Sequence, residues 1–207
     1  MIEKFKTLFS EIRENESIDI KALELNDYAA NAPDLEYVEG RKTVDKLFID
    51  LYKELNGVVI DWAAKEARHD DVLGKAKILP FQESIVNWKG IVYFDDTPED
   101  SIIRRFFPFD FFVDEACAGI LATVEQKPNI YLYQFEGEPF DLKVDINGYC
   151  ELLIEAKGFR YWQMMIKEIL TGTENYNSKL VKEYLPQLFP EFSFKQFEDK
   201  FHTLYLR

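Results

Sequence analysis

Four carboxylates that lie within six residues of one another form a group whose oxygens could bind a cation. Asp95, Asp96, Glu99 and Asp100 surround a Thr-Pro pair. Such oxygen ligands can coordinate a divalent cation, but this segment lacks the ligand spacing and the glycine of a calcium-binding loop. A solvated turn and a docking patch for a basic protein are the alternatives, because negative charge attracts a positively charged partner. We expect no metal here and take these four residues as candidate partner-binding residues.

The three tryptophans are candidates of a second kind, because aromatic side chains dominate the energetically important positions of protein interfaces. Core packing is the commoner fate of such residues, and we expect it for Trp62 and Trp162. Trp88 stands between Asn87 and Lys89 and precedes a glycine. We therefore expect Trp88 to be the most exposed of the three and count it among the candidate partner-binding residues.

A further carboxylate group, Asp110, Asp114 and Glu115, flanks a phenylalanine-rich segment. Paired carboxylates hydrolyse glycosidic bonds when they are held at a suitable separation. The sequence does not fix that separation, and Asp114 also suits an ordinary cap of a turn or helix. A carboxylate-based hydrolase is therefore an alternative that ranks below a protein without catalytic residues.

The cysteines carry no catalytic or metal-binding pattern. A nucleophilic Cys117 would need a base, and the two histidines, His69 and His202, belong to no catalytic signature. Cys117 and Cys150 both lie among apolar residues, so we expect buried, reduced thiols. The glycines form no phosphate-binding loop. These patterns predict no cofactor and no metal.

Charge and hydropathy limit the partners and the location. Lys and Arg number 25 against 38 Asp and Glu, which gives a net charge of −13. This charge repels phosphate backbones and anionic lipid, so we expect neither nucleic acid nor a membrane as partner. The N-terminus has no signal-peptide pattern, and no apolar run approaches the roughly 18 residues of a membrane span. We expect a cytoplasmic protein.

Hydrophobic periodicity predicts the elements that position these residues. Helical spacing of apolar residues predicts helices over 2–13, 23–30, 43–56, 146–154, 159–170, 178–185 and 194–204. Runs of β-branched and aromatic residues predict strands over 58–63, 75–79, 91–94, 106–113, 119–124 and 130–135. Thr43 is the expected N-cap of the helix over 43–56, and Asn56-Gly57 its expected end. The order of helices, antiparallel strands and helices indicates an α+β fold.

The strand expected over 106–113 has two largely apolar faces. Strict alternation places Phe107, Phe109, Phe111 and Val113 on one face, and Phe106, Pro108, Asp110 and Phe112 on the other. A central strand covered on both sides explains this pattern. Pro108, which lacks a backbone donor, instead suggests a bulge or a position at the sheet edge.

Several segments, taken in order, resemble the SUKH superfamily. They are Leu47–Gly57, Val58–Trp62, Gly74–Pro80, Phe107–Phe112 and the helix that leads to Gly158. This superfamily includes fungal cell-wall glucan-synthesis regulators and many bacterial immunity proteins against secreted polymorphic toxins. The resemblance implies a curved antiparallel sheet of about five or six strands, packed with helices from both chain ends. It divides the chain into an N-terminal helical segment (1–42), a SUKH-like α+β core (43–170) and a C-terminal helical extension (171–207).

The resemblance also implies a protein-binding scaffold with no catalytic residues. We therefore expect a noncatalytic cytosolic protein, most of all an immunity protein that neutralises a polymorphic toxin by direct binding. The acidic charge suits a basic toxin domain such as a nuclease. The alternatives are a regulatory scaffold without a toxin partner, the carboxylate-based hydrolase, and a small-molecule binder, which a large apolar pocket would favour.

Overall fold

The computed structural model describes residues 1–27, 46–66, 71–122, 127–135 and 137–206. The helices in these ranges are α1 (Ile2–Glu14), α3 (Lys46–Tyr52), α4 (Phe81–Ser84), α5 (Ile146–Glu155), α6 (Gln163–Thr171), α7 (Tyr176–Leu188) and α8 (Phe194–Leu204). The strands are β1 (Ile18–Asp27), β2 (Leu55–Ala64), β3 (Leu73–Ile78), β4 (Phe106–Val113), β5 (Ala116–Leu121), β6 (Ile130–Tyr133) and β7 (Phe140–Asp141). A short 3₁₀ helix, η1 (Ile102–Arg105), leads into β4.

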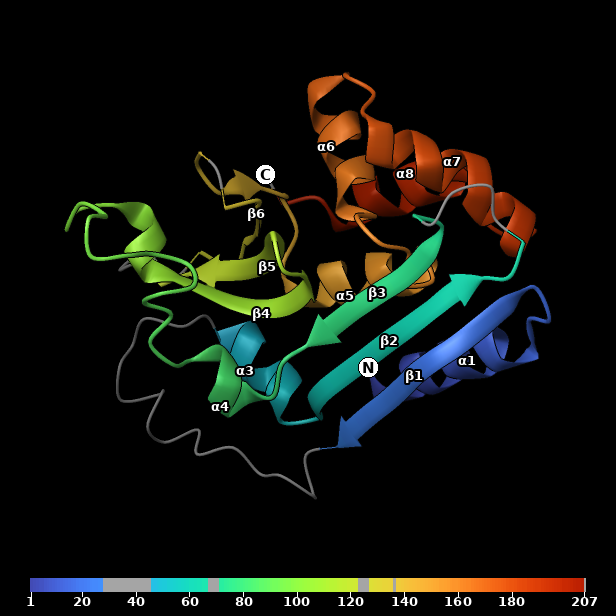
Figure 1. The fold of residues 1–207 in the computed structure, drawn as a ribbon, viewed down its shortest axis with the longest axis horizontal. Coiled ribbons are helices and arrows are strands. Elements are labelled where there is room, and N and C mark those ends of the chain that lie inside the picture. The colour runs from blue at the N-terminus through green and yellow to red at the C-terminus, as the bar shows by residue number, and fades with distance from the viewer. Residues whose placement is uncertain (28–45, 67–70, 123–126, 136, 207) are drawn as a thin grey trace.

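One antiparallel sheet forms the centre of the fold (Figure 1). Its seven strands lie side by side in chain order, and each is antiparallel to its neighbours. This arrangement confirms the α+β class, with seven strands in place of the expected five or six. Five of the six strands expected by residue range are present, and the two strands that were not expected, β1 and β7, lie at the sheet edges. The strand expected over 91–94 is wrong, because that segment forms turns with an isolated bridge between Lys89 and Tyr93.

The helix expected over 23–30 is also wrong where the structure describes it, because its first half belongs to β1. Leu23 lies opposite Ile60, and Leu25 lies opposite Val58 in the buried strand β2. The backbone groups of a buried strand need hydrogen-bond partners on both sides, and β1 supplies one of them. This long-range pairing overrides the modest helix propensity of the local sequence. Residues 28–30 lie outside the described chain.

The helix expected over 43–56 ends at Tyr52, and Asn56-Gly57 belongs to β2 instead of capping it. The backbone N–H of Phe81 donates a hydrogen bond of 2.8 Å to Oδ1 of the buried Asn56. Gly57 has a φ of 131°, which residues with a side chain rarely adopt. The pair therefore connects the start of β2 to the start of α4. Thr43, the expected N-cap, lies outside the described residues.

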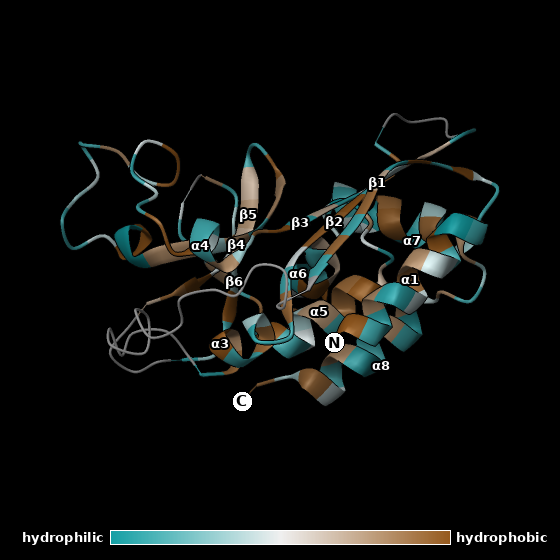
Figure 2. Cartoon of the chain, turned by 90° about the horizontal axis from the view of Figure 1, so that it is seen from below, coloured by the Kyte–Doolittle hydropathy of each residue, from teal (hydrophilic) through white to brown (hydrophobic). Residues whose placement is uncertain are grey.

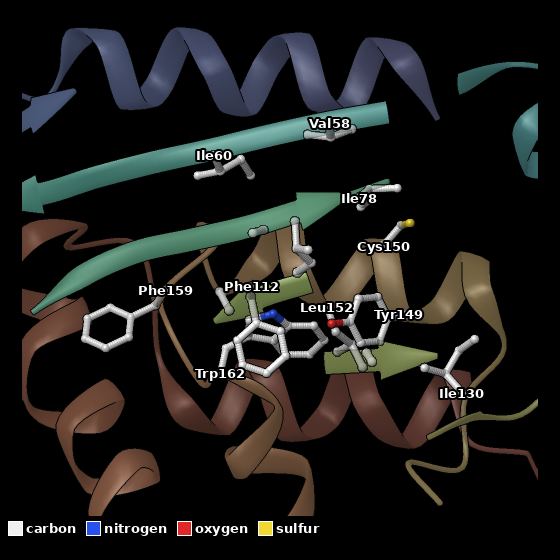
Figure 3. Packing of buried hydrophobic residues seen from close by; sticks show 14 of the residues in the cluster. Val58, Ile60, Ile78, Phe112, Ile130, Tyr149, Cys150, Leu152, Phe159 and Trp162 are labelled. Carbon is white, nitrogen blue, oxygen red and sulfur yellow. The ribbon is translucent and has the colours of Figure 1, made fainter. Parts of the chain in front are cut away.

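Helices α1, α3, α5 and α8 lie on one side of the sheet (Figure 2). Their apolar faces meet inward-facing strand residues such as Val58, Ile60 and Ile78 in the main hydrophobic cluster (Figure 3). Phe5 of α1 and Phe197 of α8 belong to the same cluster. Both ends of the chain therefore contribute to the core that covers the sheet.

Side chains of β4 belong to two hydrophobic clusters because the pairing of β4 with β5 is irregular. The register shifts between Pro108 and Asp110 and again between Asp110 and Val113. Phe109 and Phe112 both belong to the main cluster, whereas Phe111 packs on a smaller cluster around Phe106. The strict alternation expected over 106–113 is therefore wrong, because a bulge inserts an unpaired residue and turns the following side chains. The irregularity expected at Pro108 is confirmed, and β4 is an interior strand.

Candidate protein-binding site

Residues 85–105 form a lobe that extends sideways from the sheet, between α4 and β4 (green in Figure 1). The structure describes this whole segment. It contains all five candidate partner-binding residues predicted from the sequence, namely Trp88, Asp95, Asp96, Glu99 and Asp100. We refer to residues 85–105 below as the lobe.

Trp88 fastens the lobe to the sheet. Its ring stacks on that of Phe111 in β4, with centroids 5.6 Å apart and planes at 16°. Its indole N–H donates to the backbone oxygen of Ser84 at 2.9 Å, and the Ser84 hydroxyl donates to the backbone oxygen of Pro108 at 2.7 Å. Trp88 is half-buried and the other two tryptophans are buried, so the expected order of exposure is confirmed. One face of the Trp88 ring is nevertheless covered by Phe111.

Arg104 holds the acidic turn in place. Its Nε lies 3.1 Å from the backbone oxygen of Thr97 and 2.9 Å from that of Pro98, and its Nη2 also donates to Thr97. The guanidinium carbon lies 5.1 Å from the ring centroid of Tyr93, within the range of a cation–π interaction. The Tyr93 hydroxyl donates to Oδ1 of Asn87 at 2.5 Å. The lobe is thus internally bonded despite its scarcity of regular secondary structure.

Large apolar side chains are exposed on this lobe. Of eight such residues in the described chain, four belong to it: Val86 (47% exposed), Ile91 (50%), Phe94 (53%) and Ile102 (38%). Large contiguous apolar patches mark interaction sites, and half of the large exposed apolar residues of the described chain belong to this one segment. The sequence gives little warning of this group, because Ile91 and Phe94 read as members of a strand.

Carboxylates accompany these apolar side chains. Asp95 forms an ion pair of 2.5 Å with Lys89. Asp96, Glu99 and Asp100 are exposed, and none of the three forms an ion pair within the described chain. Three negative charges on the lobe, offset in part by the exposed Arg105, are therefore open to a partner.

The carboxylates of the hydrolase alternative do not converge. Asp110 is completely buried, and both of its oxygens accept hydrogen bonds inside the core. Burial raises its pKa to about 6, although the hydrogen bonds from Tyr149 and Lys77 oppose that rise. Asp114 is exposed in the turn between β4 and β5, while Glu115 accepts a hydrogen bond of 2.6 Å from the Tyr161 hydroxyl. A general acid or base must come within hydrogen-bond distance of the sugar, and the buried carboxyl of Asp110 cannot do so.

Both thiols lie in the core, as expected. Cys117 and Cys150 are free and buried, and burial raises the pKa of each thiol. Within the described residues, no group of three His, Cys, Asp or Glu side chains could hold a metal ion. Helices in the same part of the chain are too short or too polar to cross a bilayer.

A hollow of about 730 Å³ lies beside α7, at the end of the β2–β3 pair. Polar and charged residues make up most of its lining, including Glu16, Lys65, Glu183 and Gln187. A small-molecule site is typically apolar with a few polar groups that orient the ligand. This hollow therefore gives no support to the small-molecule alternative.

Comparison of the chain with protein-family models, with curated proteins and with solved structures finds no match.

Proposed function

We propose that this chain is a noncatalytic protein-binding module whose partner docks on the lobe. The observation that carries the proposal is the gathering of Val86, Ile91, Phe94 and Ile102, all exposed, on one braced segment. Apolar surface left in water is stabilised when a partner covers it. Interfaces combine such an apolar centre with a polar, accessible rim, and the carboxylates of the lobe supply charged groups for the rim.

The bracing of the lobe favours binding. Trp88 is fixed by Phe111 and Ser84, and Arg104 is fixed by the carbonyls of Thr97 and Pro98. A segment that is already ordered loses less conformational entropy when it binds than a free loop does. The lobe therefore needs little reorganisation to present its apolar side chains.

A basic protein is the partner that the charge favours. The chain carries a net charge of −13, and Asp96, Glu99 and Asp100 add locally unpaired charge on the lobe. Complementary charge accelerates encounter and disfavours wrong partners more than it adds affinity. Association should then slow as salt rises, because screening weakens interactions between exposed charges.

The narrower proposal is an immunity protein that neutralises a basic toxin domain by masking it in the cytoplasm. It rests on the resemblance of the segments between Leu47 and Gly158 to the SUKH superfamily. A regulatory scaffold without a toxin partner is the second candidate, since the same lobe would serve it equally well. The neighbourhood of the gene separates the two, because an immunity gene lies beside that of its toxin.

Coexpression with the product of an adjacent toxin-like gene tests the proposal. The wild-type chain should bind that product and restore growth, and the double variant Ile91→Ser/Phe94→Ser should do neither. The matched control, Ile20→Ser/Tyr176→Ser, removes apolar side chains that are 42% and 60% exposed outside the lobe and should behave as wild type. Failure of the wild-type chain to bind or protect would refute the immunity role. Equal binding by both double variants would remove the lobe as the docking surface.

A further inference from the structure

The lobe contains a small hollow of about 220 Å³ next to the sheet. Trp88, Tyr93, Phe106 and Phe107 line it together with Arg104. Sites for whole small molecules begin at about 300 Å³. The hollow is thus of a size that suits one amino-acid side chain, and its wall combines aromatic rings with the polar groups of Asn87 and Arg104.

Interactions within the protein fix the walls of the hollow. Trp88 stacks on Phe111, and Phe106 is 1% exposed and packs against Tyr133 with ring centroids 5.5 Å apart. Tyr93 is tied to Asn87 through its hydroxyl. These contacts hold three of the aromatic walls in place, so the hollow is formed before any partner binds.

Arg104 connects the hollow to the acidic turn. Its guanidinium lines the hollow and also binds the carbonyls of Thr97 and Pro98, the residues that Asp96 and Glu99 flank. Those carbonyls and the face of Tyr93 stabilise its positive charge without neutralising it. The turn that carries the free carboxylates therefore lies next to Arg104, and the carboxylates themselves do not line the hollow.

We infer that this hollow receives one apolar anchor side chain from a basic partner protein, with Lys or Arg beside the anchor facing Asp96, Glu99 and Asp100. This inference rests on the proposed function and identifies the chemistry that the lobe recognises. Interface energy concentrates in a few anchors of this kind, which fill desolvated pockets and are surrounded by weaker contacts. The charged neighbours of the anchor select the partner and orient it.

Nuclear magnetic resonance of the ¹⁵N-labelled chain gives a direct readout, because Trp88 is the one tryptophan that lines the hollow. The indole N–H of Trp62 donates to the backbone oxygen of Lys157 at 3.0 Å in the core, and Trp162 is also buried, so both serve as internal references. The probes are unlabelled peptides with a central Trp between pairs of Lys, the same peptide with Glu in place of Lys, and the Lys peptide with a central Gly.

The Lys peptide with the central Trp should shift the indole resonance of Trp88 in a saturable way and leave the two references unmoved. The Glu peptide and the Gly-centred peptide should each bind at least about tenfold more weakly. An unmoved Trp88 resonance, or equal responses to the Trp-centred and Gly-centred peptides, would overturn the anchor. Equal responses to the Lys and Glu peptides would overturn the charge preference.

A matched pair of variants tests the carboxylates. Asp96→Asn/Glu99→Gln/Asp100→Asn should weaken the Lys peptide about tenfold at low salt, since each exposed pair contributes a fraction of a kcal/mol. The control Glu14→Gln/Glu16→Gln/Glu183→Gln changes the net charge equally, at exposed positions outside the lobe, and should leave the affinity close to that of wild type. Equal losses in the two triple variants would show only a general charge effect and would refute the site. Another outcome is that the partner binds in a way that depends on Ile91 and Phe94 while no peptide shifts the Trp88 resonance. This result would support the proposed function and refute this inference.

Discussion

Tyr149 donates its phenolic hydrogen to Oδ2 of Asp110 over 2.7 Å, and both side chains are completely buried. This bond joins α5 to β4. Oδ1 of Asp110 accepts the backbone N–H of Lys77 in β3 at 2.8 Å, and the Tyr149 oxygen accepts Nε2 of Gln163 in α6 at 2.6 Å. A continuous hydrogen-bond path therefore crosses the core from the sheet to two helices.

The buried carboxyl should make stability depend on pH. Burial raises the pKa of Asp110 from 3.8 to about 6, so the folded chain holds this proton more tightly than the unfolded chain does. The stability that protonated Asp110 contributes to the folded chain is therefore fully present below the unfolded pKa and is lost as pH rises through about 6. The expected loss is about 3 kcal/mol between about pH 4 and about pH 7. Other carboxyl groups titrate in the same range, so the measurable quantity is a difference between two proteins.

Urea unfolding of wild type and Asp110→Asn across that pH range isolates the effect. The difference in unfolding free energy should change steadily in favour of the variant as pH rises, because Asn cannot ionise. A difference that stays constant with pH would show that Asp110 does not titrate in this window.

Replacement of Tyr149 by Phe should destabilise the fold by about 2 to 3 kcal/mol, because it leaves buried atoms of Asp110 and Gln163 without their partner. The measurement is the urea midpoint near neutral pH. Tyr176→Phe removes the hydroxyl of a side chain that is 60% exposed and should change stability by less than about 0.5 kcal/mol. Equal effects of the two changes would mean that the buried path does not stabilise the fold.

Gly74→Ala should be among the most damaging small substitutions. A Cβ at this position would overlap the indole ring of Trp62, which the hydrogen bond to Lys157 holds in place. Overpacking of this kind costs about 3 kcal/mol or prevents folding. Gly172→Ala meets open space and faces only the strain of a φ of 69°, so thermal denaturation should show a loss of about 1 kcal/mol. A mild effect at Gly74 would show that the ring of Trp62 can move.

Arg104→Ala should loosen the lobe without unfolding the protein. The change frees the carbonyls of Thr97 and Pro98, so a protease specific for Glu should cleave after Glu99 several-fold faster. Global stability should fall by only about 1 kcal/mol, because the bonds lost are at the surface. Arg105→Ala is the matched control, as its side chain is exposed. Cleavage at the wild-type rate would argue that the turn is held by other contacts.

Helices and strands with a dense local pattern of apolar residues could be predicted from the sequence. The helix expected over 194–204 matches α8, and the strand expected over 106–113 matches β4. The apolar residues of α8 recur at helical spacing, whereas β4 is recognisable from its run of aromatic residues alone, because a bulge breaks its alternation. The helix expected over 178–185 continues through Pro186 to Leu188, which local rules for proline do not anticipate.

The sequence by itself determined the α+β class, the acidic surplus and an apolar content large enough for a core, because these depend on composition and on local periodicity. The tertiary structure decided which residues are buried and which are exposed. It buried Asp110 against Tyr149, 39 residues away in the chain, and stacked Trp88 on Phe111. It also left Ile91 and Phe94 in water, although their sequence resembles that of a buried strand. Burial is a property of neighbours brought together from distant parts of the chain, and for that reason the exposed apolar residues of the candidate binding surface emerged only from the fold, whereas Trp88 and the carboxylates were already candidates in the sequence.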